Sequence, residues 1–153
     1  MTSYQIDLGQ GKVPQWLFFG FSTLDRLNGN ERLCTTRFQP GDLVEFDITR
    51  FHESLTGFPL QGSGLAAGSF YLNFLKQTQR YRNPWSSGVL SFSEFLKSNF
   101  IIVVNLEWLQ IEEGALTVKL KFKQPQNEKL CFLWMPCERR KLVIDSNLGV
   151  SVE

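Results

Sequence analysis

The chain has 153 residues, of which 42% are hydrophobic and 20% charged, and its formal net charge is +1. This length favours one domain with a substantial core, and the near-neutral charge gives no reason to expect a generic polyanion binder. No apolar run reaches the roughly 18 residues of a membrane-spanning helix, and the N-terminal MTSYQIDLGQ does not have the pattern of a signal peptide. We therefore expect a soluble intracellular domain rich in aromatic packing.

The N-terminal part of the chain has the pattern of strands separated by turns. Tyr4, Ile6 and Leu8 alternate with polar residues, which is typical of a half-buried strand. Gly20 interrupts an apolar strand and indicates a bulge or a close contact, while Leu27–Asn30 has the residue types of a turn. The strands expected here are Ser3–Leu8, Gln15–Ser22, Leu33–Phe38 (weak), Leu43–Phe51 and Thr56–Leu60.

The stretch Ser69–Leu106 carries both helices that the sequence predicts. Apolar residues spaced along one helical face predict a helix over Ser69–Tyr81, with Ser69 as its N-cap. Ser91 and Glu94 form the S-x-x-E pattern of a capping box, which predicts a second short helix over Ser91–Ser98. The segment Phe100–Leu106 is apolar at nearly every position, which fits a strand covered on both faces.

The C-terminal part contains the clearest strand in the chain. Leu116, Val118, Leu120 and Phe122 alternate with Thr117, Lys119, Lys121 and Lys123. Leu130–Met135 follows as a very apolar strand, and Pro136 indicates an edge or a strand end. Lys141–Ile144 and Leu148–Val152 flank a good hairpin turn. Roughly eight or nine strands and two short helices predict an all-β, antiparallel, eight-stranded jelly-roll sandwich with two short helical inserts.

No arrangement of residues predicts an enzyme. His52 is the only histidine, and nothing near it in the sequence suggests a nucleophile pair, so we read it as a surface or strand-end residue. Cys34, Cys131 and Cys137 have unrelated spacings, which predicts free thiols in a reducing compartment. With one histidine a structural zinc site lacks ligands. We therefore expect no catalytic residue, no cofactor and no metal.

Two basic features have alternative interpretations. Lys119, Lys121 and Lys123 line one strand face, and Arg139–Lys141 lies between two strands. Beside the basic and aromatic segment Arg80–Arg82, they have the residue types that bind nucleic acid. The alternative, which we favour, is a solvated strand face whose lysines prevent edge pairing. No specific nucleic-acid binding is expected.

Four stretches resemble a known family when they are taken in order. They are PQWLFFGFSTLDRLNGN (Pro14–Asn30), FQPGDLVEFDITRFHESLTGFPL (Phe38–Leu60), SFYLNFLKQTQRYRNPWSSGVLSFSEFLKSNFIIVVNLE (Ser69–Glu107) and GALTVKLKFKQPQNEKLCFLWMPCERRKLVIDSNLGV (Gly114–Val150). Their order and spacing are similar to the second jelly roll of the double-jelly-roll major capsid proteins of polinton elements and their adenovirus-like relatives. One departure is Asn105–Trp108, where the family tends to have Asp-Leu and a small polar residue.

The resemblance implies a structural protein of a virion, made in the cytoplasm or nucleus of a host cell. A single jelly-roll domain over residues 1–153 would self-assemble into a trimer-like capsomer or pair with a second jelly-roll chain, without a membrane. Capsid proteins of this type carry another jelly roll first, so we expect either a fragment or the product of a gene that encodes one jelly roll.

Assembly of this kind depends on a few large anchors at each interface. On residue type alone the candidate interface residues are Tyr81, Arg82, Trp85, Trp108 and Trp134. At least one of the four aromatic residues should be exposed in the isolated chain. The alternative function is a jelly-roll module that binds carbohydrate or another ligand, with a loop tryptophan stacked on a sugar ring.

Overall fold

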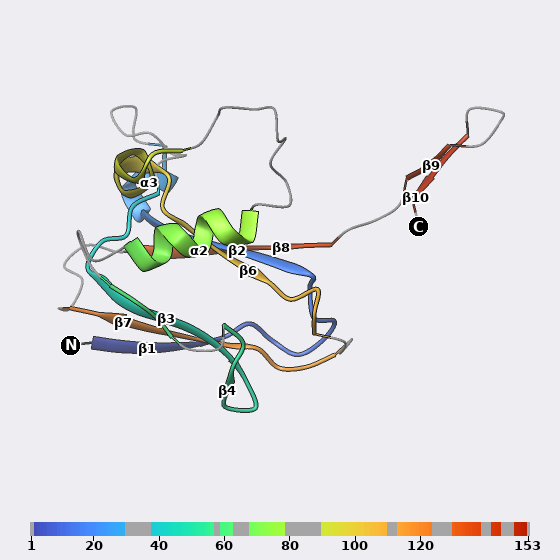
Figure 1. Cartoon of the computed structure of the whole chain (residues 1–153), viewed down its shortest axis with the longest axis horizontal. Helices are drawn as coiled ribbons and strands as arrows, with labels where there is room; N and C mark the ends of the chain where they lie inside the picture. The colour runs from blue at the N-terminus through green and yellow to red at the C-terminus, as the bar shows by residue number, and fades with distance from the viewer. Residues whose placement is uncertain are drawn as a thin grey trace.

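Two antiparallel β-sheets face each other in the computed structural model of the chain, with the two longer helices along one side (Figure 1). The structure describes residues 2–29, 38–56, 59–62, 68–78, 90–109, 113–123, 130–138, 142–144 and 149–152. The elements in chain order are β1 (Thr2–Asp7), β2 (Trp16–Thr23), α1 (Leu24–Leu27), β3 (Leu43–Arg50), β4 (Glu53–Ser54), β5 (Leu60–Gln61), α2 (Gly68–Thr78), α3 (Phe92–Ser98), β6 (Ile101–Asn105), β7 (Thr117–Phe122), β8 (Leu130–Cys137), β9 (Leu142–Ile144) and β10 (Val150–Val152).

The strand pairing divides these elements into two facing sheets and a separate hairpin. One sheet has the order β1-β7-β3-β4, and β5 also pairs with β3. The other has the order β6-β2-β8, and β9 pairs with β10 and with no other strand among the described residues. All these pairs are antiparallel. The prediction of a mainly antiparallel β-structure is confirmed at the level of a sandwich-like arrangement.

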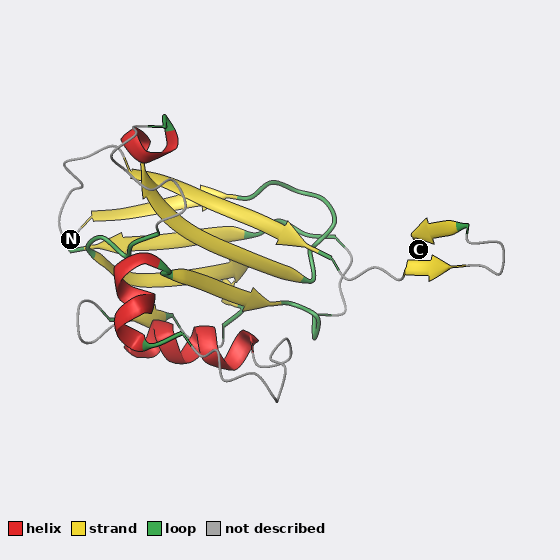
Figure 2. Cartoon of the chain, turned by 90° about the horizontal axis from the view of Figure 1, so that it is seen from above, coloured by secondary structure: helices red, strands yellow, loops and turns green. Residues whose placement is uncertain are grey.

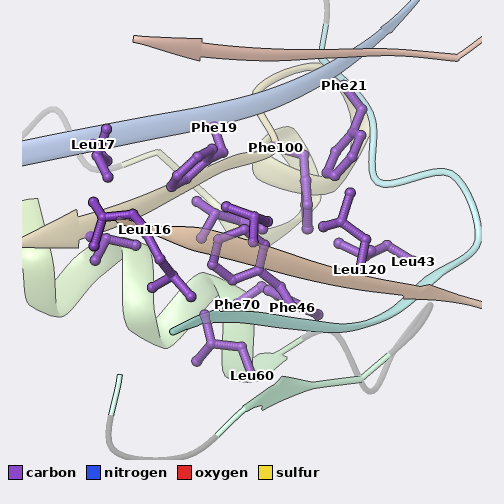
Figure 3. Packing of buried hydrophobic residues seen from close by; sticks show 14 of the residues in the cluster. Leu17, Phe19, Phe21, Leu43, Phe46, Leu60, Phe70, Phe100, Leu116 and Leu120 are labelled. Atoms are coloured by element: carbon purple, nitrogen blue, oxygen red, sulfur yellow. The ribbon is translucent and has the colours of Figure 1, made fainter. Parts of the chain in front are cut away.

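The side chains that fill the sandwich come from alternate positions of the facing strands. Phe19 of β2 and Phe46 of β3 meet across the two sheets, with ring centroids 5.1 Å apart (Figure 3). In β7 the predicted alternation is confirmed, because Val118, Leu120 and Phe122 are all buried. Strand periodicity therefore identified the inward face correctly, since successive side chains of a strand point to opposite faces.

Helix α2 closes one side of the sandwich. It packs against β6 of one sheet and β5 of the other, and Asn73 donates from Nδ2 to the carbonyl of Val103 in β6 at 3.0 Å. Ser69 was predicted to be the N-cap, but the helix begins at Gly68 and the Ser69 hydroxyl instead donates to the carbonyl of Gln61. The described part of α2 ends at Thr78, and the predicted end near Tyr81 lies outside the described residues.

Helix α1 is a third helix, where the sequence predicted two. Thr23 caps it, because its hydroxyl oxygen accepts from the backbone N–H of Arg26 at 3.4 Å. The helix has only four residues, which is too short for a helical period to be visible in a sequence. Asn28 and Gly29 then form the predicted turn, and Gly29 has a φ of +79°. The weak strand predicted over Leu33–Phe38 falls almost entirely outside the described residues.

The capping box at the start of α3 is confirmed. The Ser91 hydroxyl accepts from the backbone N–H of Glu94 at 3.2 Å, and the Glu94 carboxylate accepts from the backbone N–H of Ser91 at 3.0 Å. Each residue thereby satisfies a backbone donor that the first helical turn leaves without a partner. The helix places Phe95 in the core beside Phe100, with ring centroids 5.1 Å apart.

Glu94 should give the protein a specific sensitivity to acid. The Ser91 backbone N–H, and secondly its hydroxyl, lower the pKa of Glu94 from 4.5. Because the folded pKa is the lower one, the stabilisation is present above the unfolded pKa and is lost as the pH falls through the folded pKa. Thermal melts should show that the melting temperature of the parent protein falls between about pH 7 and pH 3. The fall should be smaller in Glu94→Gln, which has no carboxylate to protonate at this position.

The control for this prediction is Glu53→Gln, which removes an exposed carboxylate from β4. Its melting curves should follow those of the parent protein across the same pH series. If Glu94→Gln also follows the parent protein throughout, the capping carboxylate contributes nothing to acid sensitivity.

The strand predicted over Leu43–Phe51 ends one residue earlier, at Arg50. Phe51 and His52 form a two-residue turn between β3 and β4, with φ values of +49° and +66°. Positive φ at both central residues is typical of a type I′ hairpin, which usually contains Asn or Gly. This turn contains neither Asn nor Gly, so nothing in the sequence indicated it. The apolar Phe51 continued the strand pattern, and the predicted strand was therefore one residue too long.

The lysine-bearing strand does not lie at a sheet edge. β7 pairs with β1 on one side and with β3 on the other, so the interpretation of its lysines as protection against edge pairing is wrong. Lys119 and Lys123 are exposed, whereas Lys121 lies 3.3 Å from the Glu45 carboxylate of β3. The face is solvated, as we favoured, but edge protection does not explain it. Arg139–Lys141 lies outside the described residues.

Candidate functional site

Strand β8 is an edge strand without a charged residue. It pairs along its whole length with β2, from Trp16 opposite Cys137 to Thr23 opposite Leu130, and with no other described strand. Its sequence, LCFLWMPC, contains only Pro136 as a residue that opposes further pairing. Natural edge strands are usually protected by charges, bulges or short length. An uncharged edge of eight residues is therefore a candidate surface for association.

Two large side chains of β8 are exposed to solvent. Trp134 exposes 44% of its surface and Met135 exposes 56%. Phe132 on the same strand instead packs into the sandwich, with its ring stacked 5.4 Å from Phe19. Trp134 lies opposite the buried Phe19 and therefore on the same face of β8 as Phe132, whereas Met135, opposite Phe18, lies on the other face.

An apolar groove lies on the outer side of the sheet that contains β8. It has a volume of about 230 Å³. We call it the β8 groove and define it by Phe18, Phe38, Ile101, Leu133 and Met135. Phe38 crosses β2 at Gly20, where an added Cβ would lie 2.9 Å from the Phe38 ring. The predicted close contact at Gly20 is therefore confirmed, and it is part of this groove.

A second hollow lies at one end of the sandwich, beside the same tryptophan. It has a volume of about 270 Å³, and Trp134, Leu8 and Val13 are among its lining residues. Gln10 supplies an amide, and Lys12 forms an ion pair of 3.2 Å with Glu138 at its rim. We call it the end cleft. It combines one large ring with a few polar groups, which is the composition of a small-ligand site.

The predicted interface residues have different outcomes. Trp108 and Trp134 are exposed, at 58% and 44%, which confirms that at least one of the four aromatic candidates is accessible. Trp108 lies in the turn after β6, so the two residues belong to different parts of the sandwich. Tyr81, Arg82 and Trp85 lie outside the described residues.

Sequence reasoning missed several exposed apolar residues. Phe51 is 74% exposed at the β3–β4 turn, beneath the guanidinium of Arg50 at 4.7 Å from its ring. Met135, Leu142 and Val152 are each more than half exposed. The absence of charge along β8 was the one sequence signal that pointed to Met135. His52 is also exposed, beside Phe51 in the same turn. This confirms the prediction that it is a surface or strand-end residue.

Cys131 and Cys137 are both free thiols. They lie on one extended strand, six residues apart, so their Cα atoms are about 20 Å from each other. A disulfide requires Cα atoms within about 7 Å, which excludes a bond between these two residues in the folded chain.

Cys34 lies outside the described residues, and its state remains a prediction. Titration of the denatured, unreduced protein with a thiol reagent should therefore give three thiols per chain. A count of one would reveal a disulfide that includes Cys34 or links two chains, and would contradict the expected reducing compartment. The same titration after reduction gives the reference value.

Within the described residues no cluster of His, Cys, Asp and Glu has the arrangement of a metal site. None of the described helices is long and apolar enough to cross a membrane. Two surface features therefore remain as candidates, the apolar β8 groove beside the free edge of β8 and the end cleft, which also has polar lining residues. Comparison of the chain with protein-family models, with curated proteins and with solved structures found no match.

Proposed function

We propose that the protein is a structural subunit of a viral or virus-derived capsid, which assembles through the free edge and outer face of β8. The observation that carries this proposal is the uncharged edge strand with Trp134 and Met135 exposed on it. An uncharged edge strand with exposed apolar side chains is typical of a surface that a neighbouring chain covers. No residue is assigned a catalytic role.

The order of strand pairing supports an eight-stranded jelly roll as the underlying fold. β2 pairs with β8, and between them in the sequence β3 pairs with β7 in the opposite sheet. Nested pairs that alternate between two sheets result when a long hairpin wraps into a jelly roll. In this interpretation the five-stranded and the three-stranded sheet together supply the eight strands. The family resemblance of the four sequence stretches supports the same fold and a role in capsomers.

Self-association is the test of the proposed function. Sedimentation and light scattering over a hundredfold range of concentration should show the chain associating with itself or with a jelly-roll partner, through an interface of roughly 1,000 Å² or more. Met135→Lys should weaken this association by about tenfold or more, because a charge would be buried at the contact on the outer face of β8.

The matched control is Leu72→Lys, which introduces the same charge at a leucine that is 65% exposed on α2. It should leave the association unchanged. A parent protein that stays monomeric at every concentration and with every jelly-roll partner would contradict the proposal.

Carbohydrate binding is the second candidate, and the end cleft favours it. Trp134 offers a ring face and Gln10 an amide beside a hollow of about 270 Å³. An oligosaccharide array followed by titration of tryptophan fluorescence would detect such binding. A strict monomer that binds one oligosaccharide, and loses that binding in Trp134→Ala, would replace the capsid proposal with this one.

A further inference from the structure

The C-terminal hairpin of β9 and β10 lies apart from both sheets (Figures 1 and 2). Its two strands have three residues each, and Val152 lies directly opposite Leu142. An isolated two-stranded hairpin is at best marginally stable in water. The hairpin therefore needs a surface to pack on, and within the described residues its own sandwich does not supply that surface.

The apolar pair on the hairpin identifies the face that needs this cover. Leu142 and Val152 are each 59% exposed, and directly opposite residues in an antiparallel pair lie on the same face. Ser151, paired with Val143, lies on the other face and is exposed. One side of the hairpin is therefore aliphatic, and the other includes a polar residue.

The β8 groove has the complementary chemistry. All five of its defining residues are apolar, and Met135 at its margin is 56% exposed. Helices α2 and α3 lie along one side of the sandwich instead of over this face (Figure 2). A pair of aliphatic side chains thus matches the groove in polarity, with no charge to be buried on either surface.

We infer that the β9–β10 hairpin of one copy of the chain packs Leu142 and Val152 into the β8 groove of a second copy. This inference rests on the proposed self-assembly and specifies its contact. Since each copy donates one hairpin and offers one groove, the contact joins two different surfaces. It closes into a ring or a reciprocal dimer if the geometry allows, and otherwise extends into a chain.

The test compares self-association of the full chain with that of Leu142→Asp/Val152→Asp, by sedimentation over the concentration range described above. The double variant should associate roughly tenfold or more weakly, because two charges would enter an apolar groove. The control Ser151→Asp introduces a charge on the other face of the same hairpin and should associate like the parent chain. Because the hairpin lies apart from the sandwich, the melting temperature of the monomer should not change.

Charge exchange tests whether the contact is between two molecules. Met135→Lys alone should also associate weakly, whereas a mixture of Met135→Lys with Leu142→Asp/Val152→Asp should form a complex that contains both variants. Labelling one variant with a fluorophore and following it by sedimentation would detect this mixed species.

Three outcomes would overturn the inference. Unchanged association of Leu142→Asp/Val152→Asp would exclude the hairpin and leave the proposed self-assembly intact. A lower melting temperature of its monomer with unchanged association would place the hairpin on its own sandwich. An absence of association in the parent chain itself would remove both the inference and the proposed function.

Discussion

Replacing Phe46 with alanine should lower the free energy of unfolding by about 3–5 kcal/mol. Phe46 is fully buried and meets Phe19 of the opposite sheet at 5.1 Å between ring centroids (Figure 3). Its removal leaves a cavity between the two sheets in addition to the loss of buried apolar surface. Since domains are stable by only about 5–15 kcal/mol, the loss is a large part of the total. Chemical denaturation of both proteins measures it directly.

Phe51→Ala is the matched control for Phe46→Ala. It makes the same chemical change in the turn that follows the same strand, where the side chain is 74% exposed. The expected loss is at most about 1 kcal/mol, from the contact between the ring and Arg50. Similar losses in the two variants would contradict the placement of Phe46 at the centre of the sandwich.

Replacing Ser54 with alanine should destabilise the protein by about 1–3 kcal/mol. The Ser54 hydroxyl donates to Oδ1 of Asp47 at 2.6 Å, and Asp47 is only 7% exposed. Without this donor the carboxyl group keeps, among the described residues, only Thr56 as a hydroxyl donor, at 3.5 Å. A buried polar group that loses its partner costs more than the hydrogen bond itself contributes.

Urea titration measures the free energy of unfolding of Ser54→Ala, and Ser3→Ala serves as the control. Ser3 is an exposed serine on β1, so its replacement should change the stability by less than about 0.5 kcal/mol. If Ser54→Ala is equally neutral, the buried carboxyl group does not depend on the hydroxyl for its stability in the fold.

The amino-acid sequence by itself determined the features that depend on neighbours a few residues away. The alternation in β7 predicted which of its side chains are buried, and Ser91 with Glu94 predicted the capping box of α3. Both patterns depend on the period of one element, which is visible along the chain. Periodicity did not predict the two-residue turn that contains Phe51, and it did not predict helix α1. Both segments are too short to show a repeating pattern of apolar residues.

Only the tertiary structure decided which strands lie at the edges and which surfaces remain uncovered. β7 carries the lysines but has a neighbour on each side, whereas the uncharged β8 lies at an edge of its sheet. Leu142 and Val152 have residue types suited to a core, and the structure leaves them exposed on a hairpin that stands apart. Edges and exposed faces depend on pairing between segments far apart in the sequence, and the period of any one strand is the same whether or not a neighbour covers it.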